Sequence, residues 1–249
     1  MKTDLLISLA QVPVIKGNIE ANLSNHISLV EASSHLGADV VVFPELSLTG
    51  YELALLERLA FDKNSSNILT LSEAAIQYDI TIIAGCPLSV PNSVKPTISA
   101  VICFPNGQVD FYSKQYLHSG EEQYCSVGGD DYLFIIKGYK IALAICADFS
   151  SPAHALKAKK AGADLYLVSA LISDSGFKAD AQILSNIAVT HQLPVLLSNH
   201  ISSTGGWFVC GNNSVWGKSG KLVLASQTKK TGVILCSVRG EEIKEVVLR

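Results

Sequence analysis

The sequence predicts an α/β fold in which two similar sheets pack together with helices on the outside. Short apolar runs typical of buried strands alternate with segments whose apolar residues recur at helical spacing. Each half of the chain contains a β-α-β unit followed by hairpin strands, although no clear sequence repeat is present. No linker divides the 249 residues, so we expect a single domain over residues 1–249.

The order of the elements follows from apolar runs, caps and turn signals. Strands are expected at residues 4–10, 39–43, 81–86, 97–104, 109–112, 141–145, 165–169 and 194–198. Helices are expected at residues 18–37, 51–78 (in two pieces), 152–161 and 178–191. Asn18 can cap the first helix and Gly37 can end it. Residues 113–129 form a long polar loop, and loops of that length either serve a site or are disordered.

Composition limits the cellular setting and the partners. Hydrophobic residues make up 48% of the chain, charged residues only 16%, and the net charge is -3, so no electrostatic case exists for nucleic acid or an anionic membrane. Six scattered cysteines contain no C-x-x-C pair, which argues against zinc knuckles and a disulfide framework. No apolar stretch is long enough to span a bilayer or to form a signal peptide. We therefore expect a soluble cytoplasmic protein.

Cys146 stands at the most informative position of the chain. It follows the unbroken apolar run 141–145, and Ser151 and Pro152 after it suit the N-cap and first position of a helix. Cys146 should thus lie at the carboxyl end of a central strand, where open α/β sheets place reactive groups. The nearby helix start should favour a thiolate. Taken alone, the pattern also fits a small core residue.

Two ionisable side chains follow other strands. Glu45 comes after an apolar run and Pro44, and Lys114 begins the long polar loop after the strand at 109–112. Singly, each is more often a solvated surface group. Together, a carboxylate, an ammonium and a cysteine at three strand ends form a candidate catalytic set.

In these stretches the sequence resembles the nitrilase superfamily of carbon–nitrogen hydrolases, whose members carry a glutamate, a lysine and a cysteine in this order. FPELSLTGYE resembles the glutamate motif, SKQYLHSGEEQYCSVGG the lysine motif, and residues 140–170 the cysteine motif. A fourth, weaker match begins at Asn199. The resemblance covers nearly the whole chain and implies a four-layer α-β-β-α sandwich of two mixed sheets.

The resemblance also implies roles for individual residues. Cys146 would be the nucleophile that forms a thioester, and Glu45 the general base, made more basic by burial. Lys114 and the backbone N–H of Ala147 would stabilise the oxyanion. One of Glu121 and Glu122 would orient Lys114 or the substrate nitrogen, with Glu121 favoured by its distance from Gly128. The other candidates near the substrate are Glu122, Tyr51, Phe149 and Ala170, with Tyr116, Tyr124, Phe177 and Trp207 as further aromatic candidates.

By analogy with the family, the expected reaction is hydrolysis of a small linear amide or N-carbamoyl compound, without a metal or organic cofactor. A homodimer or higher homo-oligomer is implied in the same way. The chain departs from the family pattern at Ala147, Ser150, Val127 and Asn213, positions that shape the pocket, so substrate identity stays open.

Other functions are weighed against this one. A true nitrilase or an acyltransferase of the same family, and a non-catalytic scaffold with this fold, remain alternatives. A Cys–His hydrolase would need His118 or His154 as base, but His154 better suits a cap or surface position. No G-x-S-x-G occurs, which argues against a serine hydrolase. The glycine spacing at 206–211 is followed by Asn212 and Asn213 instead of the Lys and Ser/Thr of a phosphate loop.

Overall fold

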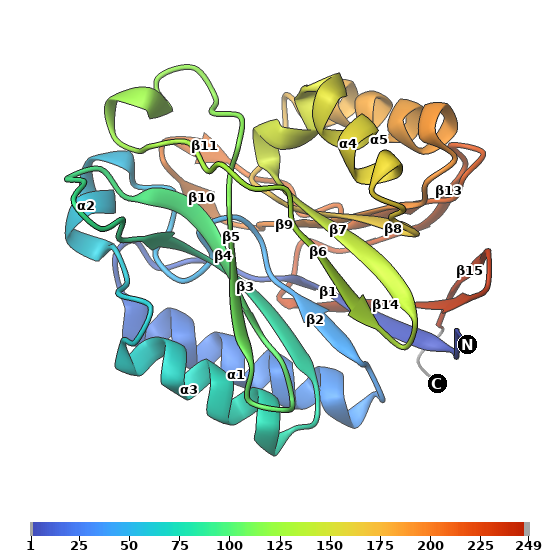
Figure 1. The fold of residues 1–249 in the computed structure, drawn as a ribbon, viewed down its shortest axis with the longest axis horizontal. Helices are drawn as coiled ribbons and strands as arrows, with labels where there is room; N and C mark the ends of the chain where they lie inside the picture. Colours follow the sequence, from blue (N-terminus) through green and yellow to red (C-terminus); the bar gives the residue numbers. More distant parts are fainter. Residues whose placement is uncertain (1, 247–249) are drawn as a thin grey trace.

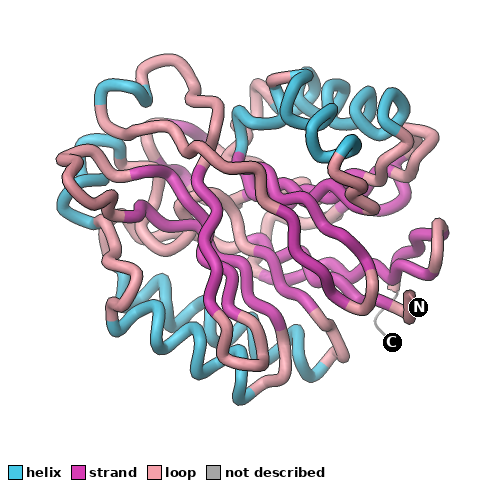
Figure 2. The backbone as a smooth tube through the Cα atoms, in the orientation of Figure 1, coloured by secondary structure: helices cyan, strands magenta, loops and turns pink. Residues whose placement is uncertain are grey.

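Two mixed β-sheets lie face to face in the computed structural model, which describes residues 2–246, and helices cover their outer faces (Figure 1). The largest apolar cluster fills the space between the sheets, and it includes Leu9, Ile83, Leu143 and Leu196. One further cluster lies beneath the helices of each sheet. The order of layers is α-β-β-α, as the resemblance implied (Figure 2).

The first sheet has seven strands in the order β15-β14-β1-β2-β3-β4-β5. Its strands are β1 (Leu5–Gln11), β2 (Val40–Val42), β3 (Thr81–Leu88), β4 (Thr97–Cys103), β5 (Val109–Ser113), β14 (Gly232–Arg239) and β15 (Glu242–Glu245). Parallel pairing joins β1, β2 and β3, and the other neighbours are antiparallel. Helices α1 (Ile19–His35) and α3 (Ser66–Gln77) cover its outer face, with the short η1 (Leu53–Leu55) and α2 (Leu56–Leu59) before α3. The Asn18 side chain accepts a hydrogen bond from Ala21 N–H, so it caps α1 as predicted.

The second sheet has six strands in the order β13-β12-β9-β8-β7-β6. They are β6 (Leu133–Ile136), β7 (Tyr139–Ile145), β8 (Leu165–Ala170), β9 (Val195–Asn199), β12 (Ser214–Trp216) and β13 (Leu222–Ala225), while β10 (Ser203–Thr204) and β11 (Trp207–Phe208) form a separate ribbon. Helices α4 (Pro152–Lys160) and α5 (Phe177–His191) cover this sheet. Strand β6 was not predicted; it turns into β7 through Lys137 and Gly138, both with positive φ, as the type I′ turn of a two-residue hairpin requires.

Polar side chains of the second sheet bond to the backbone of the first. The Ser169 hydroxyl donates to the Phe43 backbone oxygen at 2.8 Å, and the Ser198 hydroxyl donates to Val42 O at 3.0 Å. The Asn213 side chain donates to Leu9 O at 3.0 Å. These buried bonds fix the two sheets in one register, and Phe43 lies two residues before Glu45. Among the described residues, no helix is both long and apolar enough to cross a bilayer.

Candidate active site

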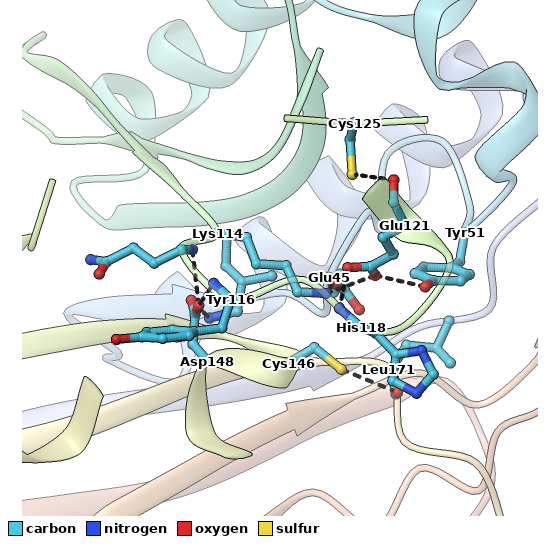
Figure 3. Close-up of polar contacts among 12 residues, drawn as sticks. Glu45, Tyr51, Lys114, Tyr116, His118, Glu121, Cys125, Cys146, Asp148 and Leu171 are labelled. Atoms are coloured by element: carbon cyan, nitrogen blue, oxygen red, sulfur yellow. Dashed lines mark hydrogen bonds and ion pairs between the residues drawn. The ribbon is translucent and has the colours of Figure 1, made fainter. Parts of the chain in front are cut away.

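Cys146 lies where β7 ends, and its backbone is strained. It begins the short 3-10 helix η3 (Cys146–Ser150), and its φ of 44° lies in the left-handed region that non-glycine residues rarely adopt. Its Sγ is 3.5 Å from the backbone oxygen of Leu171, and the residue lines a cavity (Figure 3). A strained turn that presents a reactive side chain to a cavity is typical of a nucleophile.

Asp148 holds this turn against the segment that contains Lys114. Its Oδ2 accepts hydrogen bonds from the Ile145 N–H at 2.9 Å and from the Tyr112 hydroxyl at 2.7 Å. Its Oδ1 accepts bonds from the backbone N–H groups of the two residues after Lys114, each at 2.9 Å. The side chain is buried, so these four bonds offset the loss of hydration. Asp148 therefore fixes the position of Cys146 relative to Lys114.

Glu45 follows β2 in a turn that packs tightly against β3. Gly85 of β3 faces this turn, where a Cβ would come within 2.3 Å of the Leu46 backbone nitrogen. Only glycine permits so close an approach. From the other side, His200 Nε2–H donates to the Glu45 backbone oxygen at 2.6 Å. Burial lowers the pKa of His200 to about 4, so the imidazole is neutral at pH 7.

Lys114 comes directly after β5 and extends into the space between Glu45 and Glu121. Its Nζ lies 2.7 Å from Glu45 Oε1 and 2.8 Å from Glu121 Oε1. All three side chains are buried (Figure 3). The end of β2 and the loop after β5 thus bring one ammonium and two carboxylates together away from water.

Burial and mutual attraction set the charges of this cluster. Burial raises the pKa of Glu45 to about 7, although the nearby Lys114 ammonium opposes the shift. Burial by itself would lower the pKa of Lys114, but the surrounding acidic groups outweigh it and raise that pKa above its usual range. The second oxygen of Glu45, Oε2, is buried and has no hydrogen-bond partner within residues 2–246. It is therefore an open acceptor.

The two adjacent glutamates of the loop differ completely. Glu121, in the 3-10 turn η2 (Glu121–Gln123), is buried and accepts hydrogen bonds from Lys114, from the Tyr51 hydroxyl at 2.6 Å and from the His118 N–H at 2.7 Å. Glu122 is exposed, and its carboxylate accepts a bond from the Gly120 N–H at 2.8 Å. The expectation that Glu122 contacts the substrate is therefore not met, because consecutive residues of the turn point in opposite directions.

The thiol does not have the lowered pKa that the sequence suggested. Burial is the largest cause that raises the pKa of Cys146 well above its ordinary value, and the Glu45 carboxylate adds to it. Lys114 and a backbone hydrogen bond act in the opposite direction without cancelling this effect. The helix expected to stabilise a thiolate starts only at Pro152, beyond the intervening η3. Cys146 is thus a thiol beside a carboxylate.

A cavity of about 300 Å³ joins these groups to the solvent. Its walls include Glu45, Glu121 and Cys146, and the predicted Tyr51, Ala147 and Phe149 also line it. The remaining lining residues are His118, Ser150, Leu171, Ile172, Ser173, Gly176, Asp180 and Trp207. This volume is at the small end of the range for small-molecule sites.

Ala170 was predicted near the substrate but does not line this cavity. It is fully buried in the cluster beneath α5. Neighbouring residues of a strand face opposite sides, and Ser169 points between the sheets to Phe43. Ala170 therefore faces the helix layer. Of the four further aromatic candidates, Trp207 is the one that lines the cavity.

Comparison with known proteins shows the family to which the chain belongs. The family model described as carbon-nitrogen hydrolase matches residues 6–246. The chain belongs to the carbon–nitrogen hydrolase family. The resemblance identified from the three motifs is thereby confirmed.

Relatives of this carbon–nitrogen hydrolase include amidases. It is 28% identical over 246 residues to the 2-oxoglutaramate amidase of Bacillus subtilis (strain 168), a match that covers 96% of this chain and 93% of that protein. It is 26% identical over 164 residues to an (R)-stereoselective amidase from Pseudomonas sp, which covers 66% of this chain and 59% of that protein.

Several solved structures share the fold of this hydrolase. A mutant amidase from Nesterenkonia sp. AN1, with the acetamide moiety of fluoroacetamide added covalently at its active-site cysteine, superimposes with a TM-score of 0.85 at 21% identity. That match covers 94% of this chain and 90% of the other. The glutamine-dependent NAD+ synthetase of Acinetobacter baumannii gives 0.89 at 22% identity, over 99% of this chain and 48% of the synthetase. The predicted four-layer α/β fold is confirmed.

In this carbon–nitrogen hydrolase His154 is neither a cap nor a surface residue. It is buried, with Nε2 2.8 Å from the Tyr112 hydroxyl and Nδ1 2.7 Å from the Tyr166 hydroxyl. It does not line the cavity, so the Cys–His alternative based on His154 has no geometric support. His118 does reach the cavity, from the exposed part of the loop after β5.

The sequence analysis missed Asp148 as the residue that joins the two loops, and Ser173 and Asp180 as cavity residues. The sequence did contain a signal for Asp148. A carboxylate two residues after a candidate nucleophile at the end of a buried strand is expected to be buried too, and a buried carboxylate needs hydrogen-bond donors around it. Ser173 and Asp180 lie after β8 and in the first turn of α5, and the strand-end rule applied to β8 would have pointed to this segment.

Proposed function

We propose that this protein hydrolyses the C–N bond of a small linear amide or N-carbamoyl compound through a thioester on Cys146. The main support is Glu45, which lines the same cavity as Cys146 and whose buried Oε2 has no hydrogen-bond partner among residues 2–246. A carboxylate whose pKa is raised to about 7 is a much better acceptor for a thiol proton than an ordinary glutamate.

In the acylation step, Glu45 takes the Cys146 proton as sulfur attacks the carbonyl carbon. The tetrahedral oxyanion is stabilised by the Ala147 N–H and by Lys114, which has three N–H donors, two of them directed at carboxylates. The C–N bond then breaks, and Glu45 returns the proton to the nitrogen, so that ammonia or an amine leaves. In the second step Glu45 deprotonates a water molecule, which cleaves the thioester, releases the carboxylic acid and regenerates the thiol.

Glu121 has a positioning role in this proposal. It bonds to Lys114 and to the Tyr51 hydroxyl, and so holds the ammonium beside Glu45. Two carboxylates around one ammonium also keep Lys114 charged, which oxyanion stabilisation requires.

Intact-protein mass spectrometry and ammonia release across a panel of amides, N-carbamoyl compounds and nitriles test the proposal. We expect an acyl adduct on Cys146 and ammonia from the amide or carbamoyl members, both abolished in Cys146→Ala. Cys236→Ala, which removes a buried thiol of the core, is the matched control and should retain both. Ammonia release from nitriles alone would show that the protein is a nitrilase. Transfer of the acyl group to an amine would show an acyltransferase, and an unreactive Cys146 would show a non-catalytic scaffold.

We also propose a homo-oligomer located in the cytoplasm. The family resemblance supports association through the face that bears α4 and α5, where Leu156 and Val189 are 42% and 47% exposed. The six free cysteines support a reducing compartment. Analytical ultracentrifugation of the wild type and of Leu156→Glu tests the association, and a monomeric wild type would contradict it.

A further inference from the structure

The charges around the cavity are unbalanced. Three carboxylates line it, those of Glu45, Glu121 and Asp180, and within residues 2–246 no lysine or arginine does. The Lys114 ammonium lies behind Glu45 and Glu121 and offsets part of their charge. The Asp180 carboxylate forms no ion pair with any described residue, and the basic side chain whose charge acts on it is that of His118, which also lines the cavity.

Asp180 is carried by a different element from the reacting groups. It lies in the first turn of α5, whereas Cys146 and Glu45 follow β7 and β2. The wall of the cavity also contains the apolar residues Phe149, Leu171 and Ile172, and Trp207 adds an aromatic ring. The cavity therefore combines the reacting groups, an apolar part of its wall and an acidic side chain from a separate element.

The start of α5 could by itself attract an anion, because a helix N-terminus carries partial positive charge. The Asp180 carboxylate in that first turn offsets this charge. The cavity wall also carries the His118 imidazole and the hydroxyls of Ser150 and Ser173, and the hydroxyls can accept hydrogen bonds from an ammonium. A carboxylate bound beside Asp180 would meet an acidic side chain, and among the described lining residues only His118 could offset it.

We propose that Asp180 forms a subsite for a positively charged group, so that the preferred substrate is a short amide with an ammonium at the end remote from the scissile bond. This inference rests on the proposed amide hydrolysis and names its substrate class. The Asp180 carboxylate would accept a charge-assisted hydrogen bond from the ammonium, and the apolar residues of the cavity wall would hold the methylene chain. Trp207 can add a cation–π contact.

Three amides of nearly equal length test the subsite: valeramide, γ-aminobutyramide and succinamate. They end in a methyl group, an ammonium and a carboxylate, respectively. We expect kcat/KM for γ-aminobutyramide to exceed that for valeramide by about tenfold or more, the range for a hydrogen bond to a charged group. Succinamate should be the poorest of the three. Isothermal titration calorimetry on Cys146→Ala should show the same order of affinities without turnover.

Asp180→Asn should reduce the ammonium-to-methyl ratio of kcat/KM by about tenfold. Asp180→Lys should raise the ratio of succinamate to valeramide. Asp174→Asn is the matched control, because Asp174 is an exposed acid in the segment just before α5 that does not line the cavity, and it should leave the ratios unchanged.

Turnover without a preference for the ammonium, or an unchanged ratio in Asp180→Asn, would overturn the subsite and leave amide hydrolysis standing. Preferential binding of γ-aminobutyramide to Cys146→Ala with no turnover of any amide by the wild type would support the subsite and overturn the proposed hydrolysis. Stronger binding of succinamate than of γ-aminobutyramide would overturn the subsite whichever amides are cleaved.

Discussion

Lys114 Nζ lies 2.7 Å from Glu45 Oε1, and neither side chain has solvent-exposed surface. A buried ion pair loses the hydration free energy of both groups, and only close, well-directed contacts offset that loss. Here Glu121 supplies a second contact to the ammonium at 2.8 Å. Replacing one of these charged side chains should destabilise the fold, because the remaining charges stay buried without their partner.

Lys114→Met should therefore destabilise the fold by about 3–5 kcal/mol, the usual cost of leaving buried charges unpaired. Urea denaturation at pH 8 measures the free energy of unfolding. Lys229→Met removes the exposed partner of Asp174 and should cost less than about 1 kcal/mol. Equal losses in the two variants would show that the buried cluster is not held together by its charges.

Glu121→Gln and Glu122→Gln separate the two neighbouring glutamates. Glu121→Gln weakens the bond to Lys114 and the anchoring of Tyr51, so we expect kcat/KM for amides to fall by about a hundredfold, comparable to the loss of a catalytic hydrogen-bonding group. Glu122→Gln changes an exposed carboxylate and should stay within about twofold, since surface substitutions have small effects. Steady-state kinetics with valeramide decides, and a larger loss in Glu122→Gln would contradict the assignment of Glu121.

Strand-end positions of Glu45, Lys114 and Cys146 could be predicted from the sequence, because apolar runs end there. The reason why these strand ends meet in space could not be predicted from the sequence. Glu45 and Cys146 follow strands of different sheets, so the rule for one sheet edge does not itself bring them together. Bonds between the sheets, such as that from Ser169 to Phe43, set the register that does.

Side-chain environment was the least predictable property. The proximity of a helix start to Cys146 suggested a thiolate, but the pKa depends on burial and on Glu45, which are known only once the sheets are packed. The prediction that Ala170 lies near the substrate failed for a simpler reason, because a shift of one residue along a strand moves a side chain to the other face of the sheet. Asp180 lies on a helix whose orientation over the cavity is set by tertiary packing.

Gly85→Ala should reduce activity by disturbing Glu45 without touching it chemically. The added Cβ would come within 2.3 Å of the Leu46 nitrogen and 2.5 Å of the Pro44 oxygen, so the turn that carries Glu45 must move. We expect a loss of about a hundredfold in kcat/KM, because small displacements of a catalytic group have large effects. Gly232→Ala, also in a strand, meets no atom within 4 Å and should retain activity. Circular dichroism checks that both variants are folded.

Activity should depend on pH through Glu45, whose pKa is raised to about 7. The base must be ionised to take the thiol proton, so kcat/KM for the uncharged valeramide should fall about tenfold per pH unit below pH 7. Alkylation of Cys146 by iodoacetamide should follow the same curve. In Glu45→Gln the alkylation should no longer follow a pKa of about 7 and should follow the thiol itself, because burial keeps raising the pKa of Cys146 although the contribution of the Glu45 charge is lost. A wild-type profile that is flat between pH 5 and 8 would exclude Glu45 as the base.

The same shift predicts an opposite trend for stability. Glu45 has a higher pKa in the folded protein, about 7, than its ordinary value of 4.5, so between these values the folded state binds the proton more tightly than the unfolded state. The contribution of Glu45 to the free energy of unfolding is then complete below pH 4.5 and is lost as the pH rises to 7. Denaturation of wild type and Glu45→Gln from pH 4.5 to 7 should show a decline in the wild type relative to the variant. Parallel curves would mean that Glu45 is already ionised throughout this range, in conflict with a raised pKa.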